Sequence, residues 1–563
     1  MTTLVESTEK SGVISRPAWI AIVTIIHVAA LGLLLIYENG AVPIVAALLT
    51  WGLLNFFWLL LLKRPAAAAL LSLGTVIALT ILSLFKHQFL SRTITFLDLM
   101  MVDAETTQFL FNVFPEIGFQ IAVAALVFLP LLGVTAWLDP LRVRRLVALA
   151  GFVLCFFALA GVSLLWTLDR EDEFFDRNFV SKFSRSTAAA VFDLTTGQLL
   201  ESDARAAGRL DATADTECQT DQKRPHIFLI LDESSFDATL MPGIKVPANY
   251  RNHFRSFDGK ERRLVVEGAG GPTWFTEYNV LTGLSSRSYG RFSEGVTRIA
   301  AGRVNRGLPH ALRRCGYRTF SAYPQPGAFL NARGFQTSAG IEHFLQAQDI
   351  GSRERNTDDF YYDFALRTFS WERGNGPVFY FLYVVANHFP WNFTFRPDLS
   401  PGFKGFGNRP DVDEYLRRQI MSAQYYADFL AKLRSQFPDE SFLIVRFGDH
   451  QPGFARQFVI PRLDQEEVVE RIRQFDPRYF TSYYAIDAIN FTPVDLSPAL
   501  DTLDAPNLPL VVLQAAGIPL DSSFAEQKKI LQRCRGQFYL CNNGAEARRF
   551  NRMLIDAGLI KGL

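Results

Sequence analysis

Four short stretches of the sequence place residues able to bind a metal ion or act as a nucleophile directly after apolar runs or a glycine-rich turn. These residues are Asp232 with Glu233, Thr273, His388, and Asp449 with His450. In an open α/β sheet, ligands gather at the carboxyl ends of the strands. We therefore expect the four stretches to meet at one edge of a sheet and to form one site.

Each residue also has an ordinary reading when taken alone. A carboxylate at Asp232 or Glu233 either caps the following helix or binds a metal ion. Thr273 is an N-cap or a nucleophile, and a lone histidine such as His388 often has a structural role. Together, a carboxylate, an imidazole and a hydroxyl suit a borderline divalent ion such as zinc or manganese. Such an ion lowers the pKa of a threonine hydroxyl and makes Thr273 a nucleophile at neutral pH.

The elements that must position these residues form an α/β pattern in the second part of the chain. Short apolar runs read as buried strands at 226–232, 263–268, 317–323, 377–387 and 441–449. Helical stretches at 309–316 and 413–437 lie between them. Strands that alternate with helices predict a mostly parallel sheet covered by helices on both faces.

The first part of the chain is dominated by long apolar runs. Five of them are long enough to cross a bilayer, which takes roughly 20 residues per helix. They cover residues 17–37, 41–62, 66–85, 117–138 and 146–167. The first run is too long for a cleavable signal peptide and is followed at once by the second. We therefore predict a five-helix transmembrane bundle.

The domain organisation follows from this contrast. We expect a membrane domain over residues 1–167 with an amphipathic segment near 86–116 at the outer membrane surface, a helical linker over 168–224, and a compact domain over 225–563. Outer loops carry only Lys86 and Arg92, whereas the inner flanks carry most of the basic residues. The positive-inside rule then predicts a multi-pass protein of the inner (cytoplasmic) membrane whose compact domain faces the periplasm.

The charge and the cysteines fit a cell-envelope protein. A formal net charge of +1 over 563 residues argues against nucleic-acid binding. Four of the five cysteines lie in the exported part, where disulfides persist. The spacing of Cys534 and Cys541 favours a local bridge, which leaves Cys218 to pair with Cys315.

The motifs also resemble a known family. "LDES", "GGPTWFTEYNVLTG", "GYRTFSAYPQPGAFLNARGFQTSAGIEHF", "ANHFPW" and "GDH" occur in this order over about residues 225–460. This series resembles the lipoteichoic acid synthase and phosphoglycerol transferase branch of the alkaline phosphatase and sulfatase superfamily, and the five-helix anchor fits that branch by its architecture. The resemblance implies an exported sulfatase-like domain.

The resemblance also implies roles for the site residues. The metal ligands would be Glu233, Thr273, Asp449 and His450, and Thr273 would also be the nucleophile that carries the phosphoryl group. His388 would bind or protonate at the phosphate, and Asp232 receives no ligand role. One divalent ion is implied, Mn²⁺ or Zn²⁺ with Mg²⁺ also possible, because only two of the exported histidines lie in motif positions.

Two departures from related proteins narrow the activity. Sulfatases need a C/S-x-P-x-R motif, but Thr273 is followed by Trp274 and Phe275, which makes sulfate-ester hydrolysis improbable. Lipoteichoic acid synthases place a tryptophan and a basic residue near 356–366 to hold glycerol phosphate. This chain instead has Phe360, Tyr361, Tyr362 and Asp363, with Arg353 and Arg355 as the nearest bases.

We therefore expect a membrane-anchored phosphotransferase that moves a phosphoglycerol head group from phosphatidylglycerol to a periplasmic glycan through a phosphothreonine. One alternative is a phosphoethanolamine transferase that acts on lipid A or another glycan, although such enzymes usually have "GES" where this chain has "DES". Another is a non-catalytic protein that binds a lipid or a glycan.

Overall fold

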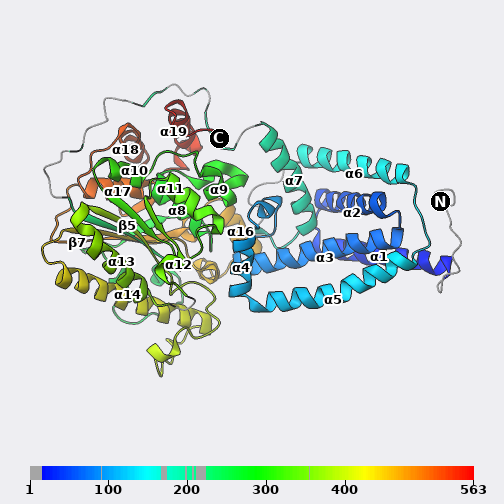
Figure 1. Cartoon of the computed structure of the whole chain (residues 1–563), viewed down its shortest axis with the longest axis horizontal. Coiled ribbons are helices and arrows are strands. Elements are labelled where there is room, and N and C mark those ends of the chain that lie inside the picture. Colours follow the sequence, from blue (N-terminus) through cyan, green and yellow to red (C-terminus); the bar gives the residue numbers. More distant parts are fainter. Residues whose placement is uncertain are drawn as a thin grey trace. The chain divides into compact units, whose positions relative to one another are not determined.

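The computed structural model describes residues 15–90, 92–166, 174–196, 199–203, 205, 208–210, 218, 224–353 and 356–562. The chain divides into two compact units, Met1–Gly197 and Gln198–Leu563. The first unit contains the long apolar helices, and the second contains the sheet (Figure 1).

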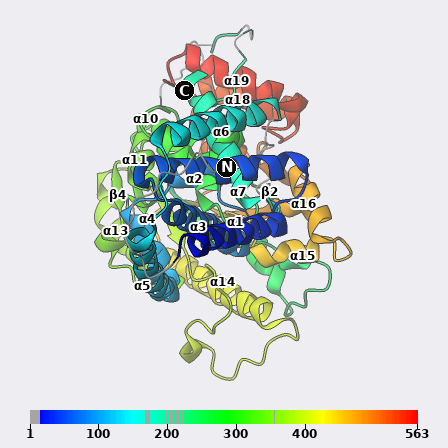
Figure 2. The same ribbon diagram turned by 90° about the vertical axis from the view of Figure 1, so that its right-hand side faces the viewer.

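The first unit is built on five long helices that lie alongside one another (Figures 1 and 2). They are α1 (Arg16–Tyr37), α2 (Ala41–Leu62), α3 (Pro65–Leu90), α5 (Pro115–Leu138) and α6 (Arg145–Leu165). All five are long and apolar enough to cross a membrane, which confirms the five predicted runs. Large apolar side chains such as Leu126 and Trp137 are 75% and 80% exposed, as a helix surface in contact with lipid requires.

Shorter helices complete this unit. The 3₁₀ helix η1 (Phe96–Met100) and α4 (Ala104–Val113) lie in the segment for which the sequence predicts an amphipathic character. Helix α7 (Phe179–Thr196) falls within the predicted linker. Other parts of that linker, among them 168–173 and 211–217, lie outside the described residues. The position of the amphipathic segment at a membrane surface stays a prediction.

The second unit is organised around one eight-stranded sheet. Its strands are β1 (His226–Asp232), β2 (Arg262–Val265), β3 (Arg318–Ala322), β4 (His343–Leu345), β5 (Val378–Val384), β6 (Phe442–Gly448), β7 (Thr481–Ile489) and β8 (Thr502–Asp504). Their order is β4-β3-β5-β1-β6-β7-β2-β8. Strand β7 is antiparallel to both of its neighbours, and every other pair is parallel. The predicted α/β fold with a mostly parallel sheet is confirmed.

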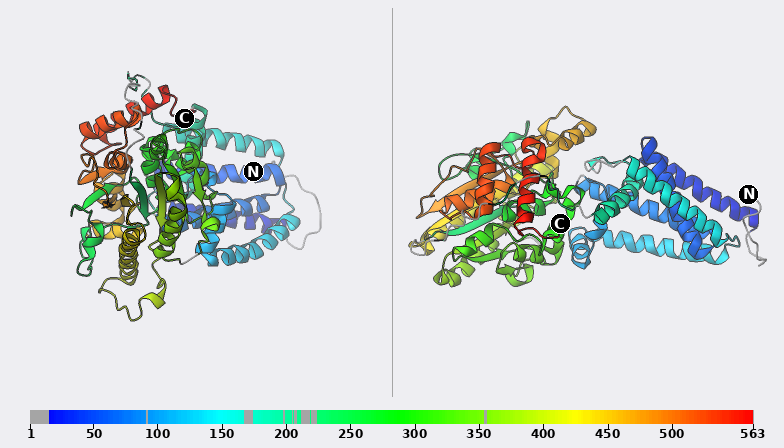
Figure 3. Two further views of the ribbon diagram at one scale, coloured as in Figure 1. Left: turned by 60° about the vertical axis from the view of Figure 1, so that its left-hand side comes forward. Right: turned by 90° about the horizontal axis from the view of Figure 1, so that it is seen from above.

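Helices cover both faces of the sheet (Figure 1). One face carries α13 (Asp358–Glu372) and α14 (Pro410–Gln436), and the other carries α8 (Thr273–Thr282), α10 (Leu308–Arg314) and α17 (Leu508–Ala515). Helices α18 (Ser522–Cys534) and α19 (Ala545–Asp556), coloured red, lie outside the layer formed by α8, α10 and α17 (Figure 3). The shorter helices are α9 (Val296–Ala300), α11 (Ala332–Ser338), α12 (Ala347–Ile350), α15 (Arg456–Val459) and α16 (Gln465–Arg473).

Two tyrosines of the segment 356–366 belong to the core under α13 and α14. Tyr361 and Tyr362 are each 2% exposed and pack with Phe228 and Tyr380 of the sheet. These two side chains are therefore part of the hydrophobic core. Arg355 lies outside the described residues.

Both predicted disulfides are present. One joins Cys218 to Cys315, and the other joins Cys534 to Cys541. Cys155 in α6 is a free thiol. The pairing that the spacing favoured is therefore confirmed.

Candidate active site

The predicted site residues follow three neighbouring strands at the centre of the sheet. Asp232, the last residue of β1, pairs with Val384 of β5 on one side and with Gly448 of β6 on the other. The three strands are parallel and end at the same level. The loops that carry Glu233, His388 and Asp449 therefore leave the sheet at one edge.

Glu233, Asp449 and His450 form a compact, buried group. Their exposed fractions are 4%, 0% and 2%, and one ligand atom from each lies within 4.8 Å of the others. The Nε2 atom of His450 is 3.5 Å from Oε1 of Glu233 and 3.2 Å from Oδ2 of Asp449. The predicted carboxylate and imidazole ligands thus converge on one point.

Hydrogen bonds orient these side chains toward that point. The Nδ1–H of His450 donates to the backbone oxygen of Gln451 at 2.9 Å, which orients Nε2 toward the carboxylates. Oδ1 of Asp449 accepts from the backbone N–H groups of Ser234 and His450 at 2.7 and 2.9 Å. Oδ2 of Asp449 is buried and has no hydrogen-bond partner among the described residues.

The three side chains shift one another's pKa values, because two carboxyl groups lie beside one imidazole. Burial raises the pKa of Glu233, but the hydrogen bond from His450 and the charges of His388 and His450 outweigh it and lower that pKa to about 2. Burial and the charge of Glu233 raise the pKa of Asp449 to about 7. Burial lowers the pKa of His450, but the charge of Asp449 and the hydrogen bond to Glu233 raise it to about 9.

A divalent cation fits this arrangement. Two buried carboxylates beside one imidazole repel each other, and Oδ2 of Asp449 lacks a donor. A cation would supply both the positive charge and the missing partner. The mixed oxygen and nitrogen donors suit zinc or manganese.

Thr273 meets this group from a different element. It is the first residue of α8, and Pro272 occupies the N-cap position, so the N-cap interpretation of Thr273 is excluded. Its Oγ1 lies 3.4 Å from Oε2 of Glu233 and 3.4 Å from Nε2 of His450. Gly270, with a φ of +70°, makes the preceding turn, where a Cβ would approach Cα of Gly453 to 3.3 Å.

His388 lies on the loop after β5. Arg418 of helix α14 holds this loop in place. The Nδ1–H of His388 donates to the backbone oxygen of Phe389 at 2.7 Å. Arg418, which is 2% exposed, donates to the backbone oxygens of His388 and Pro390 at 2.8 and 2.9 Å. The guanidinium also donates to Glu414 at 2.6 Å. The charge of His388 contributes to the lowered pKa of Glu233.

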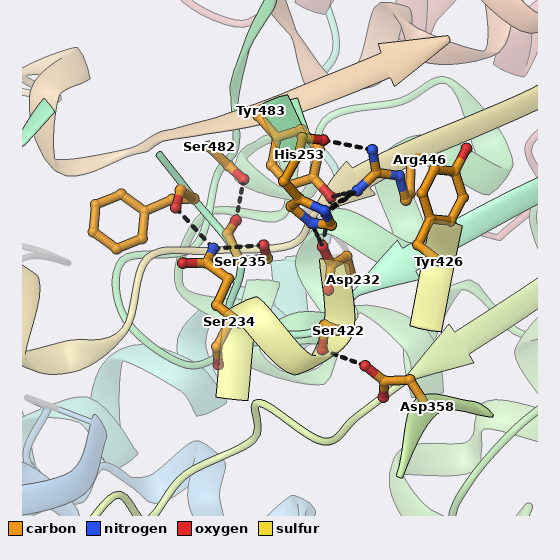
Figure 4. A network of polar contacts seen from close by, with 12 residues as sticks. Asp232, Ser234, Ser235, His253, Asp358, Ser422, Tyr426, Arg446, Ser482 and Tyr483 are labelled. Atoms are coloured by element: carbon orange, nitrogen blue, oxygen red, sulfur yellow. Dashed lines mark hydrogen bonds and ion pairs between the residues drawn. The ribbon is translucent and has the colours of Figure 1, made fainter. Parts of the chain in front are cut away.

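Asp232 belongs to a network of polar contacts that the sequence interpretation did not include (Figure 4). Its Oδ2 accepts from Nε2 of His253 at 3.0 Å and from the hydroxyl of Tyr483 at 2.5 Å. Arg446 donates to Nδ1 of His253 at 3.0 Å and to the hydroxyl of Tyr483 at 3.1 Å. Burial and the charge of Arg446 lower the pKa of His253 to about 4. An arginine inside the apolar run "FLIVRFGD" was the available signal for this network.

Comparisons with known proteins agree with the fold. Residues 265–469 match the model of the Sulfatase family. The second unit therefore contains a sulfatase-like domain, as the sequence motifs implied. A search of curated protein sequences returned no match to this chain.

Three solved structures to which the chain is similar are two transferases and one synthase by their descriptions. GacH of Streptococcus pyogenes, a phosphoglycerol transferase with bound sn-glycerol-1-phosphate, has 14% identity and a TM-score of 0.46, and covers 60% of this chain and 87% of its own. The lipoteichoic acid synthase LtaP of Listeria monocytogenes has 15% identity, a TM-score of 0.37 and coverages of 58% and 78%. The phosphoethanolamine transferase EptA of Neisseria meningitidis has 13% identity, a TM-score of 0.39 and coverages of 74% and 83%. With TM-scores below 0.5, none of them assigns an activity to this chain.

Proposed function

We propose that this protein is a membrane-anchored, metal-dependent phosphotransferase that moves phosphoglycerol from phosphatidylglycerol to a periplasmic glycan through a phosphothreonine at Thr273. The observation that supports this proposal most directly is the position of Thr273. Its hydroxyl is 3.4 Å from both Glu233 and His450, at the edge where three strands end. A threonine there has the activating surroundings that a nucleophile needs.

The metal ligands in this proposal are Glu233, Thr273, Asp449 and His450. When bound, a divalent ion supplies positive charge that lowers the pKa of the threonine hydroxyl and stabilises charge on the phosphoryl group. The protein's own contribution is orientation, since backbone N–H groups fix Asp449 and the backbone oxygen of Gln451 fixes His450.

The first transfer exchanges one ester for another. Oγ1 of Thr273 attacks phosphorus, the bond between phosphorus and the diacylglycerol oxygen breaks, and a phosphothreonine forms. The proton lost by the threonine hydroxyl is balanced by the one that diacylglycerol gains. In this proposal His388 holds the phosphoryl group or protonates the leaving oxygen.

The second transfer reverses these roles. A hydroxyl of the glycan attacks phosphorus, the bond to Oγ1 breaks, and Thr273 regains its proton as the glycan hydroxyl loses one. Both displacements use the same site, so one nucleophile and one acid suffice for the full cycle.

The choice of cargo rests on the motif series. "LDES" with two disulfides favours phosphoglycerol, whereas phosphoethanolamine transferases usually have "GES" and more disulfides. The five apolar helices keep a lipid donor within reach, and the distribution of basic residues favours a periplasmic site.

Intact mass spectrometry of the full chain in detergent tests this proposal. The metal-loaded protein is incubated with phosphatidylglycerol and, separately, with phosphatidylethanolamine. We expect an adduct of phosphoglycerol mass on the wild type, a weaker one on Thr273→Ser and none on Thr273→Ala. Thr337→Ala, which removes an exposed hydroxyl from α11, serves as the matched control and retains the adduct.

Other outcomes identify the alternatives. A phosphoethanolamine adduct that needs Thr273 establishes the other cargo. No adduct from either lipid on protein with bound metal favours a protein that binds lipid or glycan without catalysis.

A further inference from the structure

Asn387, next to His388, has an unusual environment for a buried amide. Its exposed fraction is 2%, and neither Nδ2 nor Oδ1 has a hydrogen-bond partner among the described residues. Leaving a buried polar group unpaired destabilises the folded protein. Such a group in a folded protein calls for an explanation, and a ligand that supplies the missing partner is one.

The surroundings of Asn387 place its amide beside the site. Val384, three residues earlier, pairs with Asp232, and its backbone oxygen accepts from the N–H of Glu233 at 3.1 Å. The hydroxyl of Tyr415 donates to the backbone oxygen of Ser234 at 2.9 Å. Burial raises the pKa of Tyr415, and a side-chain interaction with the amide of Asn387 acts in the opposite direction. The amide is thus close to Tyr415 and to the loop after β1, but outside hydrogen-bond geometry.

The backbone around Asn387 is fixed on both sides. The backbone oxygen of Asn387 accepts from Nε1 of Trp391 at 3.0 Å, and the N–H of Ala386 donates to Asp358 at 2.9 Å. Arg418 holds the following residues through the backbone oxygens of His388 and Pro390. Such anchoring preorganises a side chain for a ligand, because little conformational entropy is lost when the ligand binds.

The two unpaired groups, on Asp449 and Asn387, suit ligands of opposite charge. Oδ2 of Asp449 is an acceptor that suits a cation, whereas the Nδ2–H₂ group of Asn387 is a donor that suits an anion. His388 follows directly in the chain, and its charge acts on Glu233. A phosphoryl oxygen is the anionic acceptor that the proposed reaction brings to this place.

We propose that the side-chain amide of Asn387 donates a hydrogen bond to a non-bridging oxygen of the phosphoryl group that Thr273 attacks. This inference rests on the proposed phosphotransferase function and adds to it a specific contact. The ligand class is a phosphate monoester or diester. A hydrogen bond to a charged group contributes about 1.5–3 kcal/mol, which corresponds to about 10- to 100-fold in affinity.

Binding of inorganic phosphate to the metal-loaded full chain tests the contact without any lipid. Isothermal titration calorimetry is performed on the wild type, Asn387→Ala and Asn387→Asp. We expect Asn387→Ala to bind phosphate about 10- to 100-fold more weakly. Asn387→Asp should bind more weakly still, because it places a carboxylate where the amide donated.

Thermal stability and metal content separate this role from a structural one. Since the amide has no partner among the described residues, Asn387→Ala should keep the melting temperature of the ligand-free protein or raise it, with unchanged bound metal. Asn507→Ala is the matched control: Asn507 is equally buried, and its Nδ2 donates to the backbone oxygen of Gly536 at 2.9 Å. That variant should melt at a lower temperature and still bind phosphate.

The outcomes are distinct for the two proposals. Equal phosphate affinity in the wild type and Asn387→Ala overturns the inference, as does a wild type that binds no phosphate when its metal is present. Dependence of phosphate binding on Asn387, with no lipid adduct on Thr273, leaves the contact standing and rejects the phosphotransferase proposal.

Discussion

At the scale of single residues, Asp449 divides its two carboxylate oxygens between folding and ligand binding. Oδ1 accepts two backbone hydrogen bonds, and Oδ2 has no hydrogen-bond partner in the described part of the chain. Glu233 is bonded in a similar way on one side, because the Ser234 hydroxyl donates to its Oε1 at 2.9 Å. One oxygen of each carboxylate thus holds the side chain, and the other faces the proposed ion.

This division predicts the effect of an isosteric substitution. Asp449→Asn keeps the shape and the Oδ1 contacts but removes the charge that the ion needs. We expect the bound divalent metal, measured by inductively coupled plasma mass spectrometry on the purified full chain, to fall at least about tenfold. Asp411→Asn, at a partly exposed ion pair with Arg409, should retain the wild-type content. Equal metal content in both variants would exclude Asp449 as a ligand.

The identities of the candidate site residues could be read from the sequence, but their contacts could not. Glu233, Asp449 and His450 each follow a recognisable strand, and the rule for strand ends brings them together. The unpaired amide of Asn387 gives no such signal, because whether an atom has a partner depends on residues far away in the chain. The same holds for Arg418, whose bonds to the loop at 388–393 reach across about 30 residues.

At the scale of elements, the start of helix α13 is tied to the end of β5. Asp358 is 1% exposed, and its carboxylate accepts from the backbone N–H of Ala386 at 2.9 Å and from the hydroxyl of Ser422 on α14. Figure 4 shows the contact with Ser422. Three elements thus meet at one carboxyl group.

The titration of Asp358 predicts a pH dependence of stability. Burial raises its pKa to about 7, against the opposing effect of its hydrogen bonds. Because the folded pKa lies above the unfolded value of 3.8, the stabilisation is complete below that value and is lost as the pH rises through about 7. Between pH 5 and 8 the loss is about 3 kcal/mol.

We therefore expect the melting temperature of the wild type to fall from pH 5 to 8 more steeply than that of Asp358→Asn, whose side chain does not titrate. Differential scanning fluorimetry of the full chain at constant metal concentration measures both slopes. Asp398→Asn, an exposed control, should follow the wild type. Parallel slopes in all three proteins would contradict the prediction.

Strands β4, β7 and β8 were not predicted from the sequence, and their length and residue pattern explain why. Strands β4 and β8 have only three residues each, too few for an alternating pattern to stand out. Strand β7, "TSYYAIDAI", mixes polar and aromatic residues because it runs antiparallel between two strands, with Asp487 bonded to Tyr426. The long apolar strands β1, β5 and β6 were predictable because they are buried on both faces.

At the scale of the whole molecule, the two disulfides close loops of very different length. The bridge from Cys218 to Cys315 spans 97 residues, and the bridge from Cys534 to Cys541 spans 7. In the chain-entropy model a longer loop gives more stabilisation, about 5 kcal/mol for the first and about 2 kcal/mol for the second.

Replacing each pair by serine tests this difference. We expect Cys218→Ser/Cys315→Ser to lower the melting temperature of the full chain more than Cys534→Ser/Cys541→Ser does. A reducing agent should lower the melting temperature of the wild type and should not affect a variant that lacks both bridges. The reverse order of the two variants would show that local packing, rather than loop closure, dominates.

The loop between β5 and α14 has a consequence for protein engineering. Arg418 fixes its first residues, from His388 to Phe393, but farther along Leu399 and Phe403 are 41% and 40% exposed. In Figure 2 this segment is the yellow-green loop that precedes α14. Exposed residues such as Leu399 and Phe403 contribute little to the core, so we expect their replacement to leave the candidate site in position. The loop is therefore the natural place to graft sequences that redirect this protein to new acceptors.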